Sequence, residues 1–335
     1  LLYREPGSTV KRYSEKEIPF FQGQTRIVLG QNQHLDPIRI SDYLKIGGYA
    51  ALEKALQKKD RAWLVDEILA AKLRGRGGAG FLTGKKWELA RNMKTRGPKY
   101  IICNADEGDP GAYMDRSMLE GNPHAVLEGM ILAALAIGAT HGIIYVRTEY
   151  PLAIKHATLA LRDVRQLGLL GKNILGQGID FDIEIFHGAG AFVCGEETAL
   201  IKSIEGKMGE PRQRPPFPIQ KGLFGHPTCI NNVETLSNVP YIINNGAAEY
   251  LKIGVANNAG TKIFSLVGKI KNTGLVEVPL GTPIRKVVYD IGGGPSGEAK
   301  IKAIQTGGPS GGCIPASMFD LPIDYDSLAK AGSIM

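Results

Sequence analysis

The chain has 335 residues, of which 43% are hydrophobic and 22% charged, and its formal net charge is +7. These values are ordinary for a globular protein with room for two or three domains, so they argue against a disordered chain. The positive charge favours an anionic ligand or an acidic partner. An aromatic content of only 7% and dispersed basic residues argue against nucleic acid as that partner.

The four cysteines lie at positions 103, 194, 229 and 313, and none forms a CxxC pair. This spacing argues against a zinc site, an iron–sulfur cluster held by this chain alone or a disulfide framework, so we predict no metal site and a reducing, cytoplasmic location. The sequence has no long apolar run and no signal-peptide layout, which predicts no membrane span. The absence of an initial Met and of a terminating signal leads us to expect a longer polypeptide.

The first part of the chain is polar and is predicted to be an N-terminal arm, residues 1–46. It contains one strand-like run at 25–29 and a possible short helix within 36–47. Two amphipathic helices follow at 49–58 and 61–73, where apolar residues recur three and four positions apart.

A glycine-rich stretch, RGRGGAGFLTGKK (residues 74–86), follows these helices and carries basic residues at both ends. Glycine allows positive φ and close approach of backbone N–H groups to a ligand, and the basic side chains suit a phosphate. The order of residues is neither a P-loop nor a GxGxxG turn directly after a strand. A nucleotide or flavin phosphate site and a plain surface loop therefore both remain open, and a helix is predicted at 86–93.

A short buried strand at 98–103 leads into NADEGDPGAYMDR, which carries the carboxylates Asp106, Glu107 and Asp109. Open α/β sheets bind ligands at the carboxyl ends of their strands, so a cofactor site is predicted here. A solvated turn is an equally good interpretation, and a metal site is a third.

Helices and strands then alternate, with predicted elements at 124–138, 142–146, 152–167 and 181–186. This alternation predicts a three-layer α/β domain. The last strand leads into HGAGAFVCGEETAL, in which Glu196 and Glu197 open a helix. The two carboxylates either cap that helix or bind the hydroxyls of a ribose or ribityl chain.

Two further segments carry polar side chains between the helices. PRQRPPFPI (211–219) is a stiff extended loop whose Arg214 could reach a phosphate or be solvated. PTCINNVETL places Asn231, Asn232 and Thr235 near a helix start, where a capping role is the simpler interpretation.

Beyond residue 248 the composition changes to short segments between glycine and proline turns. Strands are predicted at 261–268, 274–278, 286–290 and 300–305. The two glycine-rich repeats GGGPSG and GGPSGG are predicted to be turns, because no P-loop lysine follows them.

Five motifs in this order, GRGGAGFLTGKKW, NADEGDPGAYMDR, GAGAFVCGEETAL, PRQRPPFP and INNVETL, resemble a known family. It comprises the NADH-oxidising, FMN-binding subunits of respiratory complex I and the beta subunits of soluble NAD-dependent or electron-bifurcating hydrogenases and formate dehydrogenases. The resemblance implies an α/β fold, with a Rossmann-like three-layer FMN-binding domain at 47–248 and a ubiquitin-like β-grasp domain at 249–335. An iron–sulfur helical bundle would be absent from this chain.

The resemblance also implies the site residues. FMN would be enclosed by Gly75, Arg76, Gly77, Lys86, Asn104, Asp106, Glu107, Phe192, Gly195, Glu196, Asn231, Asn232 and Thr235. NADH would lie over the flavin, with contacts from Gly78, Phe81, Asp109, Glu197, Arg214 and Phe217. In this arrangement the adenine stacks on the phenylalanines, and Glu197 holds an adenosine ribose hydroxyl and disfavours NADPH. No side chain is implied as a catalytic acid or base.

The chain departs from most complex I members at two of these positions. Phe192 stands where they have Tyr, and Asp109 stands where they often have Glu. The GDPGA sequence and the N-terminal extension are more similar to the soluble hydrogenase and formate dehydrogenase branch.

The implied function is an NADH:FMN oxidoreductase module that exchanges a hydride between NAD(H) and FMN and passes single electrons to iron–sulfur clusters, with electron bifurcation left open. The implied partners are a hydrogenase or formate dehydrogenase catalytic subunit and a small [2Fe–2S] subunit, and the ligands of a [4Fe–4S] cluster would lie outside this chain. The alternatives are a complex I NADH-dehydrogenase subunit, an enzyme that uses NADPH, and a flavin-free scaffold.

Overall fold

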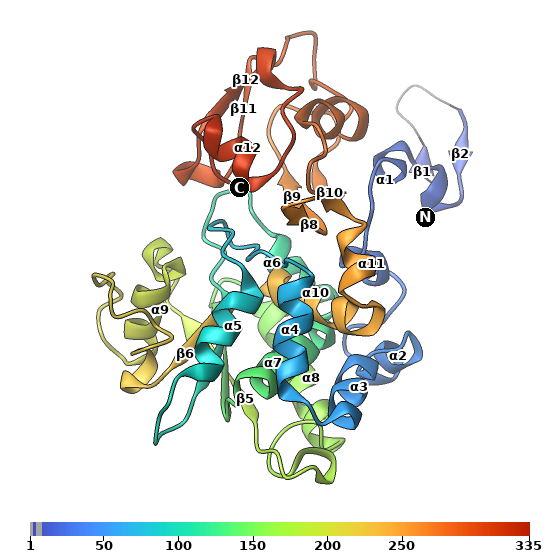
Figure 1. The fold of residues 1–335 in the computed structure, drawn as a ribbon. Helices are drawn as coiled ribbons and strands as arrows, with labels where there is room; N and C mark the ends of the chain where they lie inside the picture. The colour runs from blue at the N-terminus through green and yellow to red at the C-terminus, as the bar shows by residue number, and fades with distance from the viewer. Residues whose placement is uncertain (1–2, 5–8) are drawn as a thin grey trace. The chain divides into compact units, whose positions relative to one another are not determined.

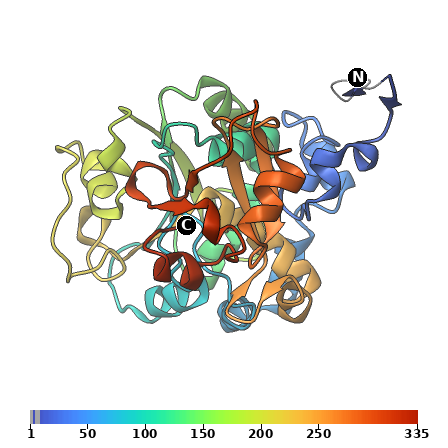
Figure 2. The same cartoon turned by 90° about the horizontal axis from the view of Figure 1, so that it is seen from above.

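The computed structural model describes residues 3–4 and 9–335, so the remaining residues of the predicted arm, 1–2 and 5–8, lie outside the described part. The chain divides into two compact units (Figures 1 and 2). The larger unit consists of residues 27–109 and 113–252, and the smaller unit consists of residues 1–26, 110–112 and 253–335. The predicted arm is thus shared between the two units.

The centre of the larger unit is a parallel four-stranded sheet in the order β5-β4-β3-β6. Its strands are β3 (Tyr100–Ala105), β4 (His141–Arg147), β5 (Asp182–Gly188) and β6 (Thr228–Asn232). From β3 the chain adds β4 and then β5 on one side of the sheet, and it then returns to add β6 on the other side of β3. The strand order therefore reverses between β3 and β6. Open α/β sheets bind ligands beyond the carboxyl ends of the strands at such a reversal.

Ten helices of the larger unit are described (Figure 1). They are α2 (Ile40–Lys45), α3 (Ala50–Lys58), α4 (Arg61–Ala70), α5 (Thr83–Asn92), α6 (Met114–Gly121), α7 (Pro123–Ile137), α8 (Pro151–Gln166), α9 (Glu197–Ile204), α10 (Val233–Asn245) and α11 (Ala247–Leu251). On one face of the sheet, Leu200 and Ile201 of α9 pack against Ile102 of β3 and Tyr145 of β4.

The opposite face of the sheet is covered by α7 and α10, which lie against β3. Successive strand residues point to opposite faces, so Ile101 and Cys103 of β3, both 0% exposed, belong to this face. Helices therefore cover both faces of the parallel sheet, which confirms the predicted three-layer α/β domain.

Helix α7 forms because its sequence supplies both end signals and an apolar interior. Asn122 caps its start by accepting a hydrogen bond from the backbone N–H of Ala125, and Gly138 ends it with a φ of 73°. Almost every residue between them is buried. Gly129 lets α10 approach closely, since a Cβ built at this position would lie 2.1 Å from the carbonyl oxygen of Leu236.

Two elements of the larger unit were missed from the sequence, and one strand that was predicted is not present. Helix α6 and strand β6 were not predicted, because α6 follows directly on a Gly- and Pro-rich turn and the β6 sequence TCINN has no apolar run. The strand predicted at 25–29 is wrong, since this segment is irregular and continues into a single helical turn at Leu29–Gln31.

The smaller unit contains α1 (Pro19–Gln22), α12 (Tyr325–Lys330) and short strands. The strands are β1 (Tyr3–Arg4), β2 (Lys11–Arg12), β7 (Gly254–Val255), β8 (Asn258–Ala259), β9 (Thr261–Leu266), β10 (Gly274–Pro279), β11 (Ala303–Gln305) and β12 (Cys313–Pro315). They pair as antiparallel two-stranded ribbons, β9 with β10 and β11 with β12 among them. The strand predicted at 286–290 is wrong, because Lys286–Ile291 is helical and buries Val287, Val288 and Ile291 on one face.

Candidate functional site

The glycine-rich loop between α4 and α5 folds back on itself. The backbone N–H of Gly75 donates to the carbonyl oxygen of Phe81 at 2.8 Å. Gly78 and Gly80 have φ values of 110° and 65°, a backbone region that only glycine adopts without strain. Helix α5 begins at Thr83, earlier than predicted, so Lys86 lies in its first turns.

The same loop packs against the start of α10. The backbone N–H of Arg76 donates to Thr235 Oγ1 at 2.8 Å, and a Cβ at Gly77 would lie 3.2 Å from Asn232 Cβ. Asn232 Oδ1 caps α10 by accepting from the N–H groups of Glu234 and Thr235, which confirms the capping interpretation. Its Nδ2 donates to Asp115 Oδ2 at 2.5 Å.

The guanidinium of Arg76 is buried and bound to the protein itself. It donates to Tyr250 Oη of α11 at 3.0 Å and to the carbonyl oxygen of Arg74 at 3.2 Å. Tyr250 in turn donates to Asn238 Oδ1 at 3.0 Å. The sequence motifs did not indicate Tyr250 or Asn238, which lie outside them.

Helix α5 connects the glycine-rich loop to α9 and β6. Lys86 Nζ lies 2.6 Å from Glu197 Oε1 and donates to the carbonyl oxygen of Ile230 at 3.0 Å. The indole N–H of Trp87, which is fully buried, donates to Asn231 Oδ1 at 3.0 Å. The side chain of Glu197 is 29% exposed, so its charge is paired but still accessible to solvent.

The carboxyl end of β3 contacts the segment before α9. Asn104 Nδ2 donates to the carbonyl oxygen of Gly195 at 2.9 Å, while its Oδ1 accepts from the backbone N–H of Asp106 at 3.0 Å. A Cβ built at Gly195 would lie 3.5 Å from the carbonyl oxygen of Asp106. These contacts bring two segments together that are far apart in the sequence.

Two of the predicted carboxylates cap helices. Glu107 accepts from the backbone N–H groups of Met114, Asp115 and Arg116 at the start of α6, at 2.8, 3.2 and 3.1 Å. Glu196 Oε2 accepts from the N–H groups of Thr198 and Ala199 at 2.9 and 3.0 Å. Capping therefore accounts for Glu196, whereas its neighbour Glu197 pairs with Lys86.

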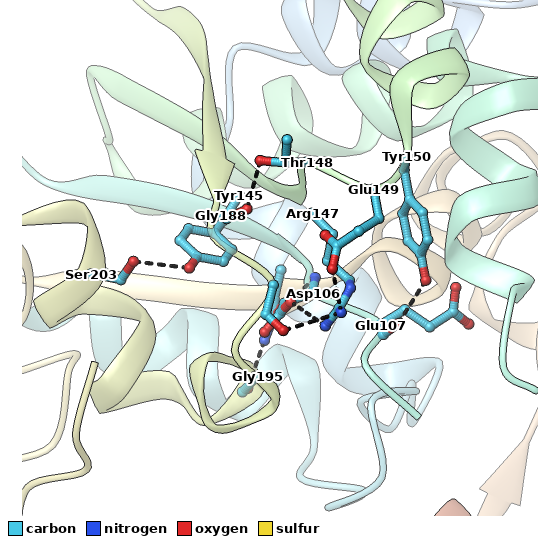
Figure 3. A network of polar contacts seen from close by, with 12 residues as sticks. Asp106, Glu107, Tyr145, Arg147, Thr148, Glu149, Tyr150, Gly188, Gly195 and Ser203 are labelled. Atoms are coloured by element: carbon cyan, nitrogen blue, oxygen red, sulfur yellow. Dashed lines mark hydrogen bonds and ion pairs between the residues drawn. The ribbon is translucent and has the colours of Figure 1, made fainter. Parts of the chain in front are cut away.

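Asp106 is a buried carboxylate beside a cation that the sequence analysis did not indicate. Its side chain is 1% exposed, and its Oδ1 lies 3.3 Å from a guanidinium nitrogen of Arg147 (Figure 3). Burial raises the pKa of Asp106 to about 6, against the opposing effect of Arg147. Within the part of the chain that the structure describes, Asp106 Oδ2 has no hydrogen-bond partner.

The residues predicted for NADH are partly exposed. Phe81 and Phe217 have 50% and 47% of their surface exposed, and the Arg214 guanidinium lies 6.0 Å above the Phe217 ring. Phe192, which was predicted for FMN, is 53% exposed. Burial raises the pKa of Asp109. Among residues 9–335, Phe217 and Phe81 make no direct ring contact with each other, and their role toward an adenine stays a prediction.

The described residues also enclose a cavity apart from this set, but they form neither a metal site nor a membrane-spanning helix. A cavity of about 270 Å³ is lined by Ala55, Lys59, Leu135 and Ile179 among others, and none of the predicted site residues lines it. Among the described residues, no group of His, Cys, Asp and Glu is arranged to hold a metal ion. None of the described helices has the length and apolar character needed to cross a bilayer.

Comparison with known proteins identifies both units. Residues 68–241 match the family model of the Nuo51 FMN-binding domain, and residues 263–314 match the SLBB domain. The NADP-reducing hydrogenase subunit HndC of Solidesulfovibrio fructosivorans is 55% identical over 313 residues, which are 93% of this chain and 63% of that protein. An NADH-quinone oxidoreductase subunit of Aquifex aeolicus (strain VF5) is 48% identical over 294 residues, 88% of this chain and 68% of that protein.

A solved structure has the same fold. The NAD+-reducing [NiFe]-hydrogenase in its H2-reduced state superposes with a TM-score of 0.79 at 37% identity, and the match covers 93% of this chain and 51% of that one. The chain thus spans 63% of the hydrogenase subunit and about half of the hydrogenase structure. The glycine-rich loop, the residues after β3, the start of α9 and the start of α10 all fall inside the matched FMN-binding domain. The chain belongs to the family of NADH-oxidising, FMN-binding subunits that respiratory complex I shares with NAD-linked hydrogenases.

Proposed function

We propose that this chain is the FMN- and NAD(H)-binding module of a multisubunit oxidoreductase. The observation that carries the proposal is the convergence of separate segments at the β3–β6 reversal of the sheet. The glycine-rich loop is bonded to α10 through Thr235, α5 is bonded to α9 through Glu197, and Asn104 at the carboxyl end of β3 is bonded to Gly195. Ligands bind at such a reversal in open α/β sheets.

The residues at this edge fit FMN. Gly77 packs closely on Asn232, so a larger residue there would crowd this edge, and glycine-rich backbone of this kind brings N–H groups close to an anion. The unpartnered Oδ2 of the buried Asp106 offers an acceptor to a ring N–H. Since Glu107, Glu196 and Asn232 use their side chains as helix caps, we expect them to shape the site mainly by holding its loops.

When bound, FMN supplies the ability to accept a hydride and to release electrons one at a time. The residues of this chain would bind and orient the two rings and keep water away from them. We expect the exposed rings of Phe81 and Phe217 to be the groups on which the adenine of NADH stacks, and Arg214 lies above Phe217. We expect no side chain to act as an acid or base in the hydride step.

The partners in this proposal are a hydrogenase or formate dehydrogenase catalytic subunit and a small [2Fe–2S] subunit. The identity of 55% with a hydrogenase subunit and the solved hydrogenase structure support this assignment. A [4Fe–4S] cluster, with ligands outside this chain, would receive the electrons. We propose a cytoplasmic location because the cysteines at 103, 194, 229 and 313 are all unpaired.

A titration of the purified chain with FMN, followed by the quenching of flavin fluorescence, tests the proposal. We expect saturable binding of one FMN per chain. We expect Gly77→Val to weaken this binding by about tenfold or more, because the valine side chain would crowd Asn232 at the edge where FMN is proposed to bind. Gly297→Val is the matched control, since a Cβ at Gly297 meets nothing within 4 Å. No quenching by the folded wild-type chain would favour the flavin-free scaffold.

The second candidate is a module that uses NADP(H). It is favoured by the name of the NADP-reducing relative and by the position of Lys86 Nζ, 2.6 Å from Glu197 Oε1, where the cation offsets repulsion of a 2′-phosphate. The rates at which NADH and NADPH reduce the bound flavin separate the two. Faster reduction by NADH supports our proposal, and faster reduction by NADPH supports the second candidate.

A further inference from the structure

The segment Arg147–Tyr150, at the carboxyl end of β4, binds the loops on both sides of it (Figure 3). Strand β4 lies between β3 and β5 in the sheet, so its end is adjacent to both of their loops. Thr148 Oγ1 donates to the carbonyl oxygen of Gly188 at 2.8 Å, on the β5 side. Tyr150 Oη donates to the carbonyl oxygen of Glu107 at 2.7 Å, on the β3 side.

Arg147 is the member of this segment that reaches both loops with one side chain. Its guanidinium donates to Asp106 Oδ1 at 3.3 Å and to the carbonyl oxygen of Gly190 at 3.2 Å. A third contact, to Glu149 Oε1 at 2.9 Å, fixes the orientation of the guanidinium plane. A planar guanidinium holds several acceptors at once, which a single ammonium group does not do.

The loop on the β5 side is packed tightly against this arrangement. Gly190 has a φ of 83°, and a Cβ at this position would lie 2.3 Å from Glu149 Oε1. A Cβ at Gly108, on the β3 side, would lie 2.8 Å from a guanidinium nitrogen of Arg147 and 3.0 Å from the Phe192 ring. The β3-side loop therefore packs on Arg147 itself, and the β5-side loop packs on Glu149, which is bonded to Arg147.

We propose that Arg147 is a positioning residue that holds two loops, 104–109 and 187–196, at the spacing required for FMN by pairing with Asp106 on one side and binding the Gly190 carbonyl on the other. The part that concerns FMN rests on the proposed function. The part that concerns the loops is a property of the protein without ligand.

The charges around Asp106 agree with this role. Its side chain is 1% exposed and faces Arg147 and Tyr145 of β4 and Glu149 just beyond that strand, while Cys194 lies beside Tyr145. Burial and, to a smaller extent, Glu149 raise the pKa of Asp106 to about 6, and Arg147 opposes them by lowering it. Without Arg147 a buried carboxylate would have no cation beside it, so its pKa would rise and the group would become protonated at higher pH.

Hydrogen exchange of the ligand-free protein tests the positioning of the loops. We expect Arg147→Met to increase amide exchange in peptides that cover 104–109 and 187–196. The matched control is Arg165→Met, because Arg165 also joins a carboxylate, Asp182, to a backbone carbonyl, that of Ile183, at the opposite end of the sheet. Unchanged exchange in both loops of Arg147→Met, or an equal increase in Arg165→Met, would overturn the proposal.

FMN titrations over a range of pH test the role toward the ligand. We expect Arg147→Met to bind FMN about tenfold more weakly at neutral pH, with its pH transition moved to higher pH, and Arg147→Lys to recover part of the affinity. The loss should shrink when Asp106 is already Asn, because Arg147 acts in part through Asp106. Wild-type affinity and pH profile in Arg147→Met would refute the inference, whereas a wild-type chain that binds no FMN would refute only the proposed function and leave the exchange result standing.

Discussion

Single polar residues at the carboxyl edge of the sheet use their hydrogen bonds mainly on the protein itself. Arg76 binds Tyr250, Asn104 binds Gly195 and Lys86 binds Glu197. Buried polar groups need such partners, because an unsatisfied donor or acceptor costs about 1–3 kcal/mol. The site is therefore organised before any ligand arrives, which lowers the ordering cost of binding.

His124 makes the stability of the larger unit depend on pH. Its ring is 1% exposed, stacks on Tyr43 at 5.6 Å between ring centroids and shares a hydrogen bond with Tyr49 Oη at 3.0 Å. Burial lowers its pKa from 6.5 to about 4, so the folded protein holds the neutral ring while the unfolded chain binds a proton. Stability is therefore lost as pH falls from 6.5 toward 4, by up to about 1.4 kcal/mol per pH unit.

Urea unfolding at several pH values checks this prediction. We expect the free energy of unfolding of His124→Gln to fall less steeply with acid than that of the wild type. Asp106, whose pKa is raised to about 6, has the opposite sign, because its carboxyl binds a proton more readily in the folded state and adds stability as pH falls through that value. The Asp106→Asn variant should therefore lose stability more steeply in acid than the wild type. For His124, parallel curves of unfolding free energy against pH for His124→Gln and the wild type would contradict the role given to its ring.

Helix caps and close helix–helix contacts determine where the loops of the candidate site lie. The carboxylates of Glu107 and Glu196 accept hydrogen bonds from the first N–H groups of α6 and α9. The amide oxygen of Asn232 does the same for α10, so each of these side chains fixes where a helix starts. A cap of this kind contributes about 1 kcal/mol to helix stability. The same residues thereby fix where the loops of the candidate site end.

The crossing of α7 and α10 depends on Gly129. Because a Cβ at this position would lie 2.1 Å from the carbonyl oxygen of Leu236, Gly129→Ala forces the two helices apart. We expect a loss of about 1–3 kcal/mol in the free energy of unfolding, despite the better helix propensity of alanine. Denaturant unfolding measures it, with Gly297→Ala expected to stay within about 0.5 kcal/mol of the wild type. Equal stability of the two variants would show that the crossing adjusts without strain.

For the whole molecule, binding of FMN should appear as added stability. A ligand that binds only the folded state, present at about 100 times its dissociation constant, adds about 2.7 kcal/mol. We expect the thermal unfolding midpoint to rise with FMN concentration in the wild type and less so in Gly77→Val. An equal rise in both proteins would mean that FMN acts somewhere other than the glycine-rich loop.

Much of this molecule can be predicted from local sequence patterns. Apolar residues three and four positions apart indicated α3 and α4, an Ala-, Leu- and Ile-rich stretch indicated α7, and the alternating sequence FDIEIF indicated β5, because side-chain period is encoded by neighbouring residues. The order of the motifs identified the family. The helix at Lys286–Ile291 was mistaken for a strand, since its buried residues are too few to distinguish the two periods.

The strand order decided what local patterns could not. Arg147 became a neighbour of Asp106 and Gly190 only because β4 lies between β3 and β5, and Glu107 became a helix cap only because α6 folds back onto it. Hydrogen bonds between residues far apart in the chain depend on register and on which strands are adjacent, and neither is written in any short stretch of residues. The sequence by itself determined the elements and the family, while the tertiary structure decided which polar groups meet and which of them remain for a ligand.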